Sequence, residues 1–198
     1  MTVTGIETAG KGKYQVYLEG QLAFVLYGSE LSRYQIEENA ELSDETYDRI
    51  LKEVLLKRAQ ARSLYLLKSM DRTEYQIRQK LKEGNYPEPI IEEVIRWLYG
   101  FHYLDDRRYT ENYISLKKDS RSRRQIILDL TNRGIPKELA EEVFEAESME
   151  DETALIRKWM EKKKIDPDTA EPKEIQKFYQ FLIRKGFRAS DIAKVLRW

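Results

Sequence analysis

The segment "SRSRRQIILDLTNRGI", residues 120–135, contains the pattern that decides the fold. Ile126 and Leu130 lie four positions apart, which places them on one face of a helix. Gly134 and Ile135 follow, and a left-handed glycine with an apolar residue after it is a common way to end a helix. The segment therefore predicts the end of one helix, a tight turn and the start of another helix.

The same pattern occurs three times along the chain. A leucine is followed thirteen residues later by a valine at Leu81 and Val94, Leu130 and Val143, and Leu182 and Val195. Apolar residues stand four positions before these leucines, and Asn or Gly stands four positions after them, namely Ile77 and Asn85, Ile126 and Gly134, and Phe178 and Gly186. A further helix fits before each pair, so we predict three consecutive three-helix bundles of about fifty residues each.

The starts of the middle helices of these bundles are also marked in the sequence. Thr73 and Ser122 each precede a glutamine by three residues, Gln76 and Gln125, which is the capping-box spacing. In the third bundle, Pro172 suits the first turn of a helix. Bundles that bury their faces against sequential neighbours form an elongated arc. We expect nine or so helices, and one core joining the first and third bundles would contradict the repeat interpretation.

Before the repeats, apolar residues alternate with polar ones. The alternating positions are Tyr14, Val16 and Leu18, and then Leu22, Phe24 and Leu26. This period indicates a hairpin with the turn at "EGQ", and "TVTGIET" is expected to supply a third strand. A helix from Ser43 to about Lys68 would follow, with a length of about 40 Å if it is unbroken. No sheet is expected after residue 40.

The predicted fold is therefore mainly α, with three tandem three-helix-bundle repeats in an elongated arc after a small N-terminal antiparallel β-sheet. The expected regions are a β-rich region at residues 1–42, repeat 1 with its long leading helix at 43–100, repeat 2 at 101–148 and repeat 3 at 149–198. Trp97 and Trp198 occupy equivalent places in the first and third repeats. We expect them in cores or at repeat junctions, although the terminal one could instead be an exposed anchor.

The composition limits the class of protein. The 198 residues include 35 basic and 35 acidic residues, so the net charge predicts no partner and only the charge distribution can. The absence of cysteine removes disulfides and thiolate metal sites and suits the cytoplasm. The N-terminal residues have no apolar stretch of signal-peptide length, and the longest apolar run is too short to span a bilayer. We expect a soluble cytoplasmic protein without cofactor or metal.

Charge is unevenly distributed along the chain. Residues 57–82 contain eight basic and two acidic residues, and residues 117–133 contain six and two. Residues 136–154 instead contain eight acidic residues and one lysine. This distribution predicts a polarised surface.

Three arginines, Arg121, Arg123 and Arg124, stand at the expected start of a helix. Cations in the first turn oppose the helix dipole at a cost of about 0.3–1 kcal/mol each. Replacing all three with glutamate is therefore expected to leave stability equal or slightly higher. The arginines are either a solvated face or a contact for an anionic partner, either DNA phosphate or an acidic protein surface.

The middle unit, "LDDRRYTENYI" followed by "RSRRQIILDLTNRGI", resembles the RecX family of bacterial regulators of the RecA recombinase. "SMDRTEYQIRQKL" and "FYQFLIRKGFRASDIAKVL" are similar to the first and third repeats of that family, and the resemblance covers roughly residues 58–198. It implies a regulator without enzymatic activity that lies in the helical groove of a RecA filament on DNA. Such a protein would lower ATP hydrolysis and strand exchange and limit the growth or persistence of the filament.

The resemblance and the basic segments together favour one set of residues for binding RecA or DNA. The set is Arg107, Arg108, Lys117, Lys118, Arg121, Arg123 and Arg124. The expected partners are a RecA filament and, weakly, single- or double-stranded DNA, with no membrane and with the protein as a monomer. The lysine run 162–164 is either a solvated helix end or part of a site, and the sequence favours the helix end.

Further residues of the middle repeat are assigned structural roles. Asp105 and Asp106 are expected as an N-cap and a first-turn acid, since two adjacent carboxylates make a weak metal site. Tyr109 and Tyr113 are four positions apart and are expected to pack in a core, with base stacking as the alternative. Gly134 and Gly186 are the expected helix stops, and His102 is expected in a partly buried turn rather than as a general base.

Three classes of function are compared. An enzyme is least favoured, because no phosphate-binding glycine loop, nucleophile with histidine or metal-ligand cluster is visible in the sequence. A general helical-repeat DNA-binding protein is the alternative to a RecA regulator, and it predicts tight, steeply salt-dependent binding to bare DNA. The sequence leaves open whether the protein inhibits or stimulates RecA and which contacts are to RecA or to DNA.

Overall fold

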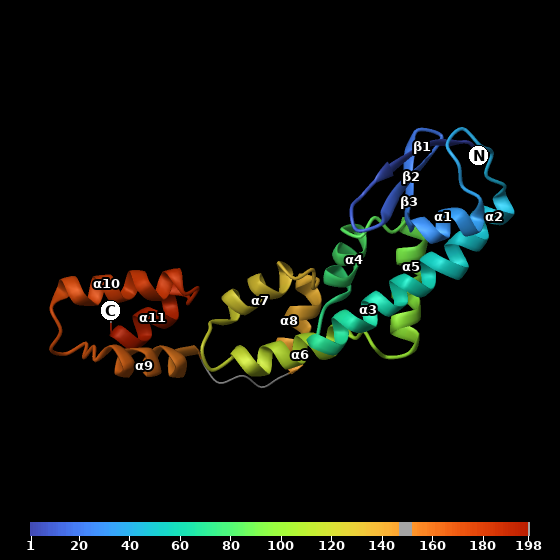
Figure 1. Ribbon diagram of the computed structural model, residues 1–198. Helices are drawn as coiled ribbons and strands as arrows, with labels where there is room; N and C mark the ends of the chain where they lie inside the picture. Colours follow the sequence, from blue (N-terminus) through green and yellow to red (C-terminus); the bar gives the residue numbers. More distant parts are fainter. Residues whose placement is uncertain (147–151, 198) are drawn as a thin grey trace. The chain divides into compact units, whose positions relative to one another are not determined.

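The computed structural model describes residues 1–146 and 152–197. The chain divides into two compact units, Met1–Asp105 and Asp106–Trp198 (Figure 1). Strands occur only near the N-terminus of the described part, and helices make up most of the rest, so the predicted fold class, mainly α after a small N-terminal antiparallel sheet, is confirmed. The expected boundary between residues 148 and 149, and Trp198, lie outside the described residues.

A three-stranded antiparallel sheet begins the first unit. It consists of β1 (Val3–Thr8), β2 (Lys13–Leu18) and β3 (Gln21–Tyr27) in the order β1-β2-β3. Glu19 and Gly20 join β2 to β3 with φ values of 49° and 79°, as in the type I′ turns that suit the twist of hairpins. An isolated bridge also pairs Thr2 with Glu41, but among the described residues no strand follows β3, as expected.

The alternation expected along β3 holds for two of its three apolar residues. Phe24 and Leu26 are fully buried, whereas Leu22 is 40% exposed. The register shifts between Val16, which pairs with Phe24, and Tyr17, which pairs with Leu22. This bulge inserts one extra residue in β3 and thereby turns the side chain of Leu22 to the opposite face of the sheet.

A short helix, α1 (Gly28–Tyr34), follows the sheet and was not expected from the sequence. The Tyr27 backbone N–H donates to Glu30 Oε2 at 2.7 Å, so the Glu30 carboxylate caps the start of the helix. The expected long helix consists of α2 (Asp44–Arg49), a π-helical segment η1 (Ile50–Leu56) and α3 (Lys57–Ser69). The junction residues keep right-handed helical dihedrals, so the π segment interrupts the α-helical hydrogen-bond pattern without ending the helix.

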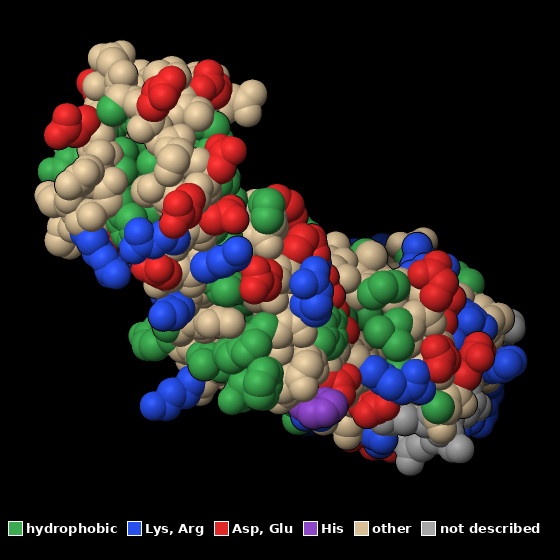
Figure 2. All heavy atoms as spheres, turned by 90° about the vertical axis from the view of Figure 1, so that its right-hand side faces the viewer, with side chains coloured by type: hydrophobic (Ala, Val, Ile, Leu, Met, Phe, Trp, Pro, Cys, Tyr) green, Lys and Arg blue, Asp and Glu red, His purple; other side chains and the backbone are tan. Residues whose placement is uncertain are grey.

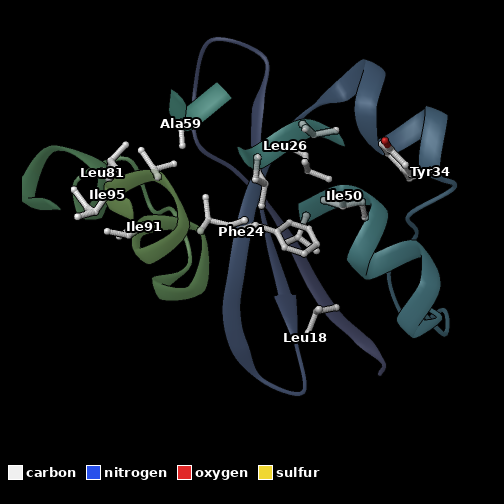
Figure 3. Close-up of a cluster of buried hydrophobic side chains, with 14 of the residues drawn as sticks. Leu18, Phe24, Leu26, Tyr34, Ile50, Ala59, Leu81, Ile91 and Ile95 are labelled. Carbon is white, nitrogen blue, oxygen red and sulfur yellow. The ribbon is translucent and has the colours of Figure 1, made fainter. Parts of the chain in front are cut away.

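The long helix and the sheet share a hydrophobic core with the first helical repeat (Figure 3). Leu18, Phe24 and Leu26 from the sheet lie in the same cluster as Ile50 from the long helix and Ile91 from the repeat. The first repeat consists of α3 with α4 (Glu74–Lys82) and α5 (Glu88–Gly100). Trp97 is half-buried at the side of this core, and its ring centroid lies 5.5 Å from that of Phe101.

The second unit contains the other two repeats. The middle repeat has α6 (Asp106–Lys117), α7 (Arg123–Thr131) and α8 (Lys137–Ala146). The last repeat has α9 (Glu152–Lys163), α10 (Pro172–Arg184) and α11 (Ala189–Leu196). Each has its own hydrophobic cluster, and neither cluster includes residues of the first repeat. The described residues therefore form separate cores in series, as the repeat interpretation requires.

The three helix stops have one geometry. Asn85, Gly134 and Gly186 have φ values of 56°, 84° and 85°. The residue after each of them donates its backbone N–H to a carbonyl five positions earlier, at 3.2, 3.1 and 3.2 Å. This is the hydrogen bond of a Schellman stop, and it turns the chain toward the last helix of each repeat. None of the described helices is long and apolar enough to cross a membrane.

Candidate functional site

The start of α7 is fixed by a buried serine. Ser122 is completely buried, and its Oγ accepts a hydrogen bond from the Gln125 backbone N–H at 3.3 Å. The same hydroxyl donates to the Lys185 carbonyl in the turn after α10 at 2.7 Å. The Gln125 side chain donates to Asp129 Oδ1 at 3.2 Å. The Ser122 cap therefore also attaches the middle repeat to the last repeat.

The first of the three arginines faces a carboxylate of its own repeat. Arg121 forms an ion pair with Asp129 through Nη1 and Oδ2, with side chains that are 42% and 19% exposed. Asp129 Oδ2 also accepts a hydrogen bond from the Tyr113 hydroxyl at 3.2 Å. The negative partner of Arg121 is therefore an acid eight residues later in the chain, on the next turns of α7.

Arg123 is likewise surrounded by groups of this chain. Its backbone N–H donates to Glu152 Oε1 at 2.7 Å, so the first residue of α9 caps α7. Its guanidinium lies 5.4 Å from the centroid of the Phe144 ring and 4.0 Å from Glu145 Oε1. Glu145 and Glu152 belong to the acidic segment 136–154, which therefore supplies partners for the basic segment.

A cleft of about 450 Å³ lies beside the start of α7, within the second unit. Four cations line it, together with two carboxylates and the apolar side chains of Ile127 and Phe187; the charged residues are Arg123, Arg124, Lys137, Arg188, Glu141 and Glu152. Both carboxylates have partners, since Glu141 pairs with Lys137 at 3.3 Å and Glu152 caps α7.

Arg124 and Arg188 differ from the other cations of the cleft. Both are exposed, and their side chains form no ion pair or hydrogen bond with any residue in the described part of the chain. Two guanidinium groups in one concave site, without a partner in the described part of the chain, suit a phosphate or a carboxylate, which guanidinium binds through paired N–H groups. The cleft is therefore a candidate anion-binding site.

The other basic residues expected to bind lie outside the lining of this cleft. Arg107 Nη1 donates to Glu142 Oε1 at 2.8 Å, and its Nε lies 3.4 Å from Glu111 Oε1; the bond to Glu142 is the main reason that the Arg107 pKa is raised. Arg108 is exposed near the start of α6. Lys117 and Lys118 stand at the end of α6, where the helix dipole favours cations. Of the seven expected residues, the cleft brings together only Arg123 and Arg124.

The two tyrosines of α6 take part in packing and hydrogen bonding. The rings of Tyr109 and Tyr113 stack with centroids 6.3 Å apart, and both pack against the core of the middle repeat. Arg133 donates to the Tyr109 hydroxyl at 3.0 Å and lies 4.9 Å from the Tyr113 ring centroid. Burial raises the pKa of the Tyr113 hydroxyl. These contacts link α6 to the end of α7.

The remaining structural residues lie at helix boundaries. α6 begins at Asp106, directly after Asp105. His102 lies in a turn with a φ of 56° and is exposed, so the expected partial burial was wrong. Among the described residues, no three His, Cys, Asp or Glu side chains form a group that could hold a metal ion.

Lys162 and Lys163 occupy the last turn of α9. The Lys162 ammonium lies over the Trp159 ring, and the Lys163 ammonium lies over the Phe181 ring.

Sequence reasoning missed Arg188 and the acids that neutralise the arginines. The signal for the acids was present, because the acidic segment 136–154 follows the basic segment 117–133 closely. We interpreted these segments as a polarised surface, whereas Glu145 pairs with the Arg123 guanidinium and Glu152 accepts a hydrogen bond from the Arg123 backbone N–H. Figure 2 shows basic side chains next to acidic ones over much of the face that it draws.

Comparisons with known proteins agree on one family. The sequence matches the RecX first three-helix domain over residues 59–98 and the RecX third three-helix domain over residues 150–196. It is 32% identical over 193 residues to the regulatory protein RecX of Caldanaerobacter subterraneus subsp. tengcongensis, covering 96% of this chain and 95% of that protein. It is 31% identical to the regulatory protein RecX of Finegoldia magna, covering 93% and 92% of the two chains.

Solved structures are similar over most of the chain. A crystal structure of regulatory protein RecX has a TM-score of 0.65 at 26% identity and covers 99% of this chain and 98% of its own. A crystal structure of RecX from Lactobacillus salivarius has a TM-score of 0.61 at 22% identity, with 72% and 95% of the two chains covered. The second of these similarities concerns the fold alone.

Proposed function

The chain belongs to the RecX family of regulatory proteins, and from this premise we propose that it regulates RecA by binding filaments of RecA on DNA. Bound in the helical groove of the filament, a monomer of the protein contacts RecA and, weakly, DNA. It thereby lowers ATP hydrolysis and strand exchange and limits the growth or persistence of the filament. The protein acts by binding, in the cytoplasm, without a cofactor and without catalysing a reaction.

One observation carries this proposal: Arg124 and Arg188 lie in one cleft without a carboxylate partner among the described residues. Arg121 and Arg123 have partners within the chain, so they shape the site more than they supply free charge. The Ser122 hydroxyl and the Glu152 carboxylate hold α7 against the last repeat, which fixes the position of Arg124 at the second residue of that helix. The backbone positions of the cations are therefore fixed before an anion binds, which removes that part of the ordering cost of binding.

The alternative is a general DNA-binding protein, since phosphate and carboxylate fit the same cleft. The two functions differ in what they require of bare DNA. Neutralising phosphates makes affinity fall steeply with salt, and tight binding to DNA would need many such contacts. A regulator of the filament needs only weak affinity for DNA and a strong effect on RecA.

The test is a titration of the protein into RecA that is hydrolysing ATP on single-stranded DNA. We expect hydrolysis to fall when the protein is well below the molar concentration of RecA, because one molecule in the groove contacts several RecA protomers. A parallel titration with labelled DNA and no RecA should show weak binding. No effect on hydrolysis at equal concentrations would refute the proposal, and tight binding to bare DNA together with that result would establish the alternative.

A further inference from the structure

The first unit contains a second concave site, separate from the residues discussed above. A groove of about 630 Å³ lies between the sheet, α3 and the turn after α4. The side chains used in the argument below are Lys13, Tyr27, Arg58, Arg62, Lys80 and Tyr86. Four of these six are cations, and Glu83 is the only acid in the lining of this groove in the described part of the chain.

Two of the four cations are neutralised by acids of the same unit. Arg58 Nη2 donates to both carboxylate oxygens of Glu30 at 2.5 Å, and its Nη1 donates to the Val25 carbonyl at 3.0 Å. Lys80 Nζ donates to Glu83 Oε2 at 2.6 Å. Glu30 and Glu83 are therefore already engaged, and they do not compensate the remaining charge of the groove.

Lys13 and Arg62 supply that remaining charge. Both are exposed, and neither pairs with a carboxylate within the described residues. Lys13 extends from β2 and Arg62 from α3, so the two charges belong to different walls of the groove. Their placement suits a ligand that carries more than one negative charge along its length.

Aromatic rings lie next to these cations. The Lys13 ammonium is 5.6 Å from the centroid of the Tyr27 ring, and the Arg62 guanidinium is 5.9 Å from that of Tyr65. Tyr65 lies three residues after Arg62 on α3, just outside the lining of the groove, and it is 68% exposed and so open to a ligand that extends beyond the groove. Tyr86 is half-buried in the groove, where burial raises the pKa of its hydroxyl and the charges of Arg58 and Arg62 oppose that rise.

We propose that this groove binds a single strand of nucleic acid. Lys13 and Arg62 contact successive backbone phosphates, and a base stacks on the exposed ring of Tyr65. Cations that alternate with exposed aromatic rings are typical of sites for single strands, because every base offers a flat face to a ring. An acidic peptide would use the cations but would gain little from the rings. A duplex keeps its bases stacked inside and would use only the phosphate contacts.

The site rests on the weak DNA contact in the proposed function and deepens it by placing a single strand in the first unit. It is tested without RecA, so its failure is distinguishable from a failure of the effect on RecA. The experiment measures fluorescence anisotropy of a labelled oligothymidylate of about 16 nucleotides with the full-length protein, without RecA, over a range of salt. The test variant is Lys13→Glu/Arg62→Glu. The matched control is Lys52→Glu/Arg96→Glu, which reverses two exposed cations of the same unit outside the lining of the groove.

We expect the test variant to bind at least about tenfold more weakly than the control. The slope of log K against log salt should also become less negative by about 1.4, since each lost phosphate contact with a single strand contributes about 0.7. A duplex of the same length should bind more weakly than the single strand. Equal affinity and equal salt dependence for the two variants would overturn the proposal.

A second pair of variants tests stacking separately from charge. Tyr65→Ala should reduce affinity about fivefold, whereas Tyr75→Ala, which removes another exposed ring of the same unit, should not. Both rings are exposed, so both variants are expected to fold.

If Lys13→Glu/Arg62→Glu loses inhibition of RecA while its affinity for the oligonucleotide is unchanged, the groove binds an acidic protein segment and the proposal is wrong. If affinity falls while inhibition persists, the groove and the cleft act independently.

Discussion

At the scale of residues, the three arginines at the start of α7 have different roles although they lie within four positions of one another. Arg121 pairs with Asp129, Arg123 lies over Phe144 and near Glu145, and Arg124 has no carboxylate partner among the described residues. The helix dipole disfavours a cation at each of these positions, so it does not explain why their contacts differ. The contacts of each side chain decide which arginine is available to a partner.

The structure changes the expected effect of reversing these charges on stability. Replacing Arg121, Arg123 and Arg124 together with glutamate would place new carboxylates beside Asp129, Glu145 and Glu152. We therefore expect a loss of about 1 kcal/mol or more, since the ion pair of Arg121 is lost and like charges are brought together. Arg124→Glu alone should change stability by no more than about 0.5 kcal/mol, or raise it slightly through the dipole. Urea unfolding measures both, and equal stability of the two variants would contradict the assigned contacts.

Sequence alone predicted the location of these arginines but not their partners. Asp129 is eight residues from Arg121, and Glu145 and Glu152 belong to other helices. Such pairings depend on how helices pack, whereas propensities and spacings describe only neighbours along one element. Arg188 was missed for the same reason, because the turn after α10 meets α7 only through tertiary contacts.

At the scale of elements, local signals predicted most helix boundaries. The Thr73 capping box is present, with Gln76 N–H donating to Thr73 Oγ1 at 3.2 Å and Thr73 N–H donating to Gln76 Oε1 at 3.3 Å. α10 begins at Pro172. The π segment and the bulge in β3 were not predicted, because each inserts a residue into a regular pattern and is stabilised by the surrounding packing.

The turn after α10, in the last repeat, contacts Ser122 of the middle repeat, and this contact can be tested by mutation. Gly186 has a φ of 85°, and a Cβ placed on it would lie 2.7 Å from Ser122 Oγ. Gly186→Ala should therefore cost the strain of a left-handed alanine, about 1–2 kcal/mol, and about 1 kcal/mol more for the displaced Ser122 hydrogen bonds. Gly20→Ala, at a φ of 79° and with nothing within 4 Å of the added Cβ, serves as the reference for strain alone.

The serine contact can be isolated with a double-mutant cycle. In a Ser122→Ala background the hydroxyl is absent, so the additional cost of Gly186→Ala should shrink toward the strain seen at Gly20. Denaturant unfolding gives the four free energies. Strictly additive costs of Ser122→Ala and Gly186→Ala would show that the turn after α10 does not depend on Ser122.

At the scale of the whole molecule, three hydrophobic clusters in series replace a single core. The first joins the sheet to the first repeat, and the middle and last repeats have one each. The thirteen-residue offset of Leu and Val predicted this arrangement, because the same buried positions recur in each repeat. The sharing of one core by the sheet and the first repeat was not visible from periodicity, since it depends on tertiary packing against the long helix.

The central claim is that the cleft beside α7 is the surface through which this protein acts on RecA filaments. The most direct test compares Arg124→Glu/Arg188→Glu with Lys173→Glu/Lys177→Glu in the inhibition of ATP hydrolysis by preformed filaments. The control is matched in charge, and Lys173, like Arg124, is an exposed cation at the second residue of its helix. We expect the cleft variant to lose most inhibition, because it removes the two cations that have no carboxylate partner among the described residues, and the control to keep it. Equal inhibition by the two variants would contradict the account.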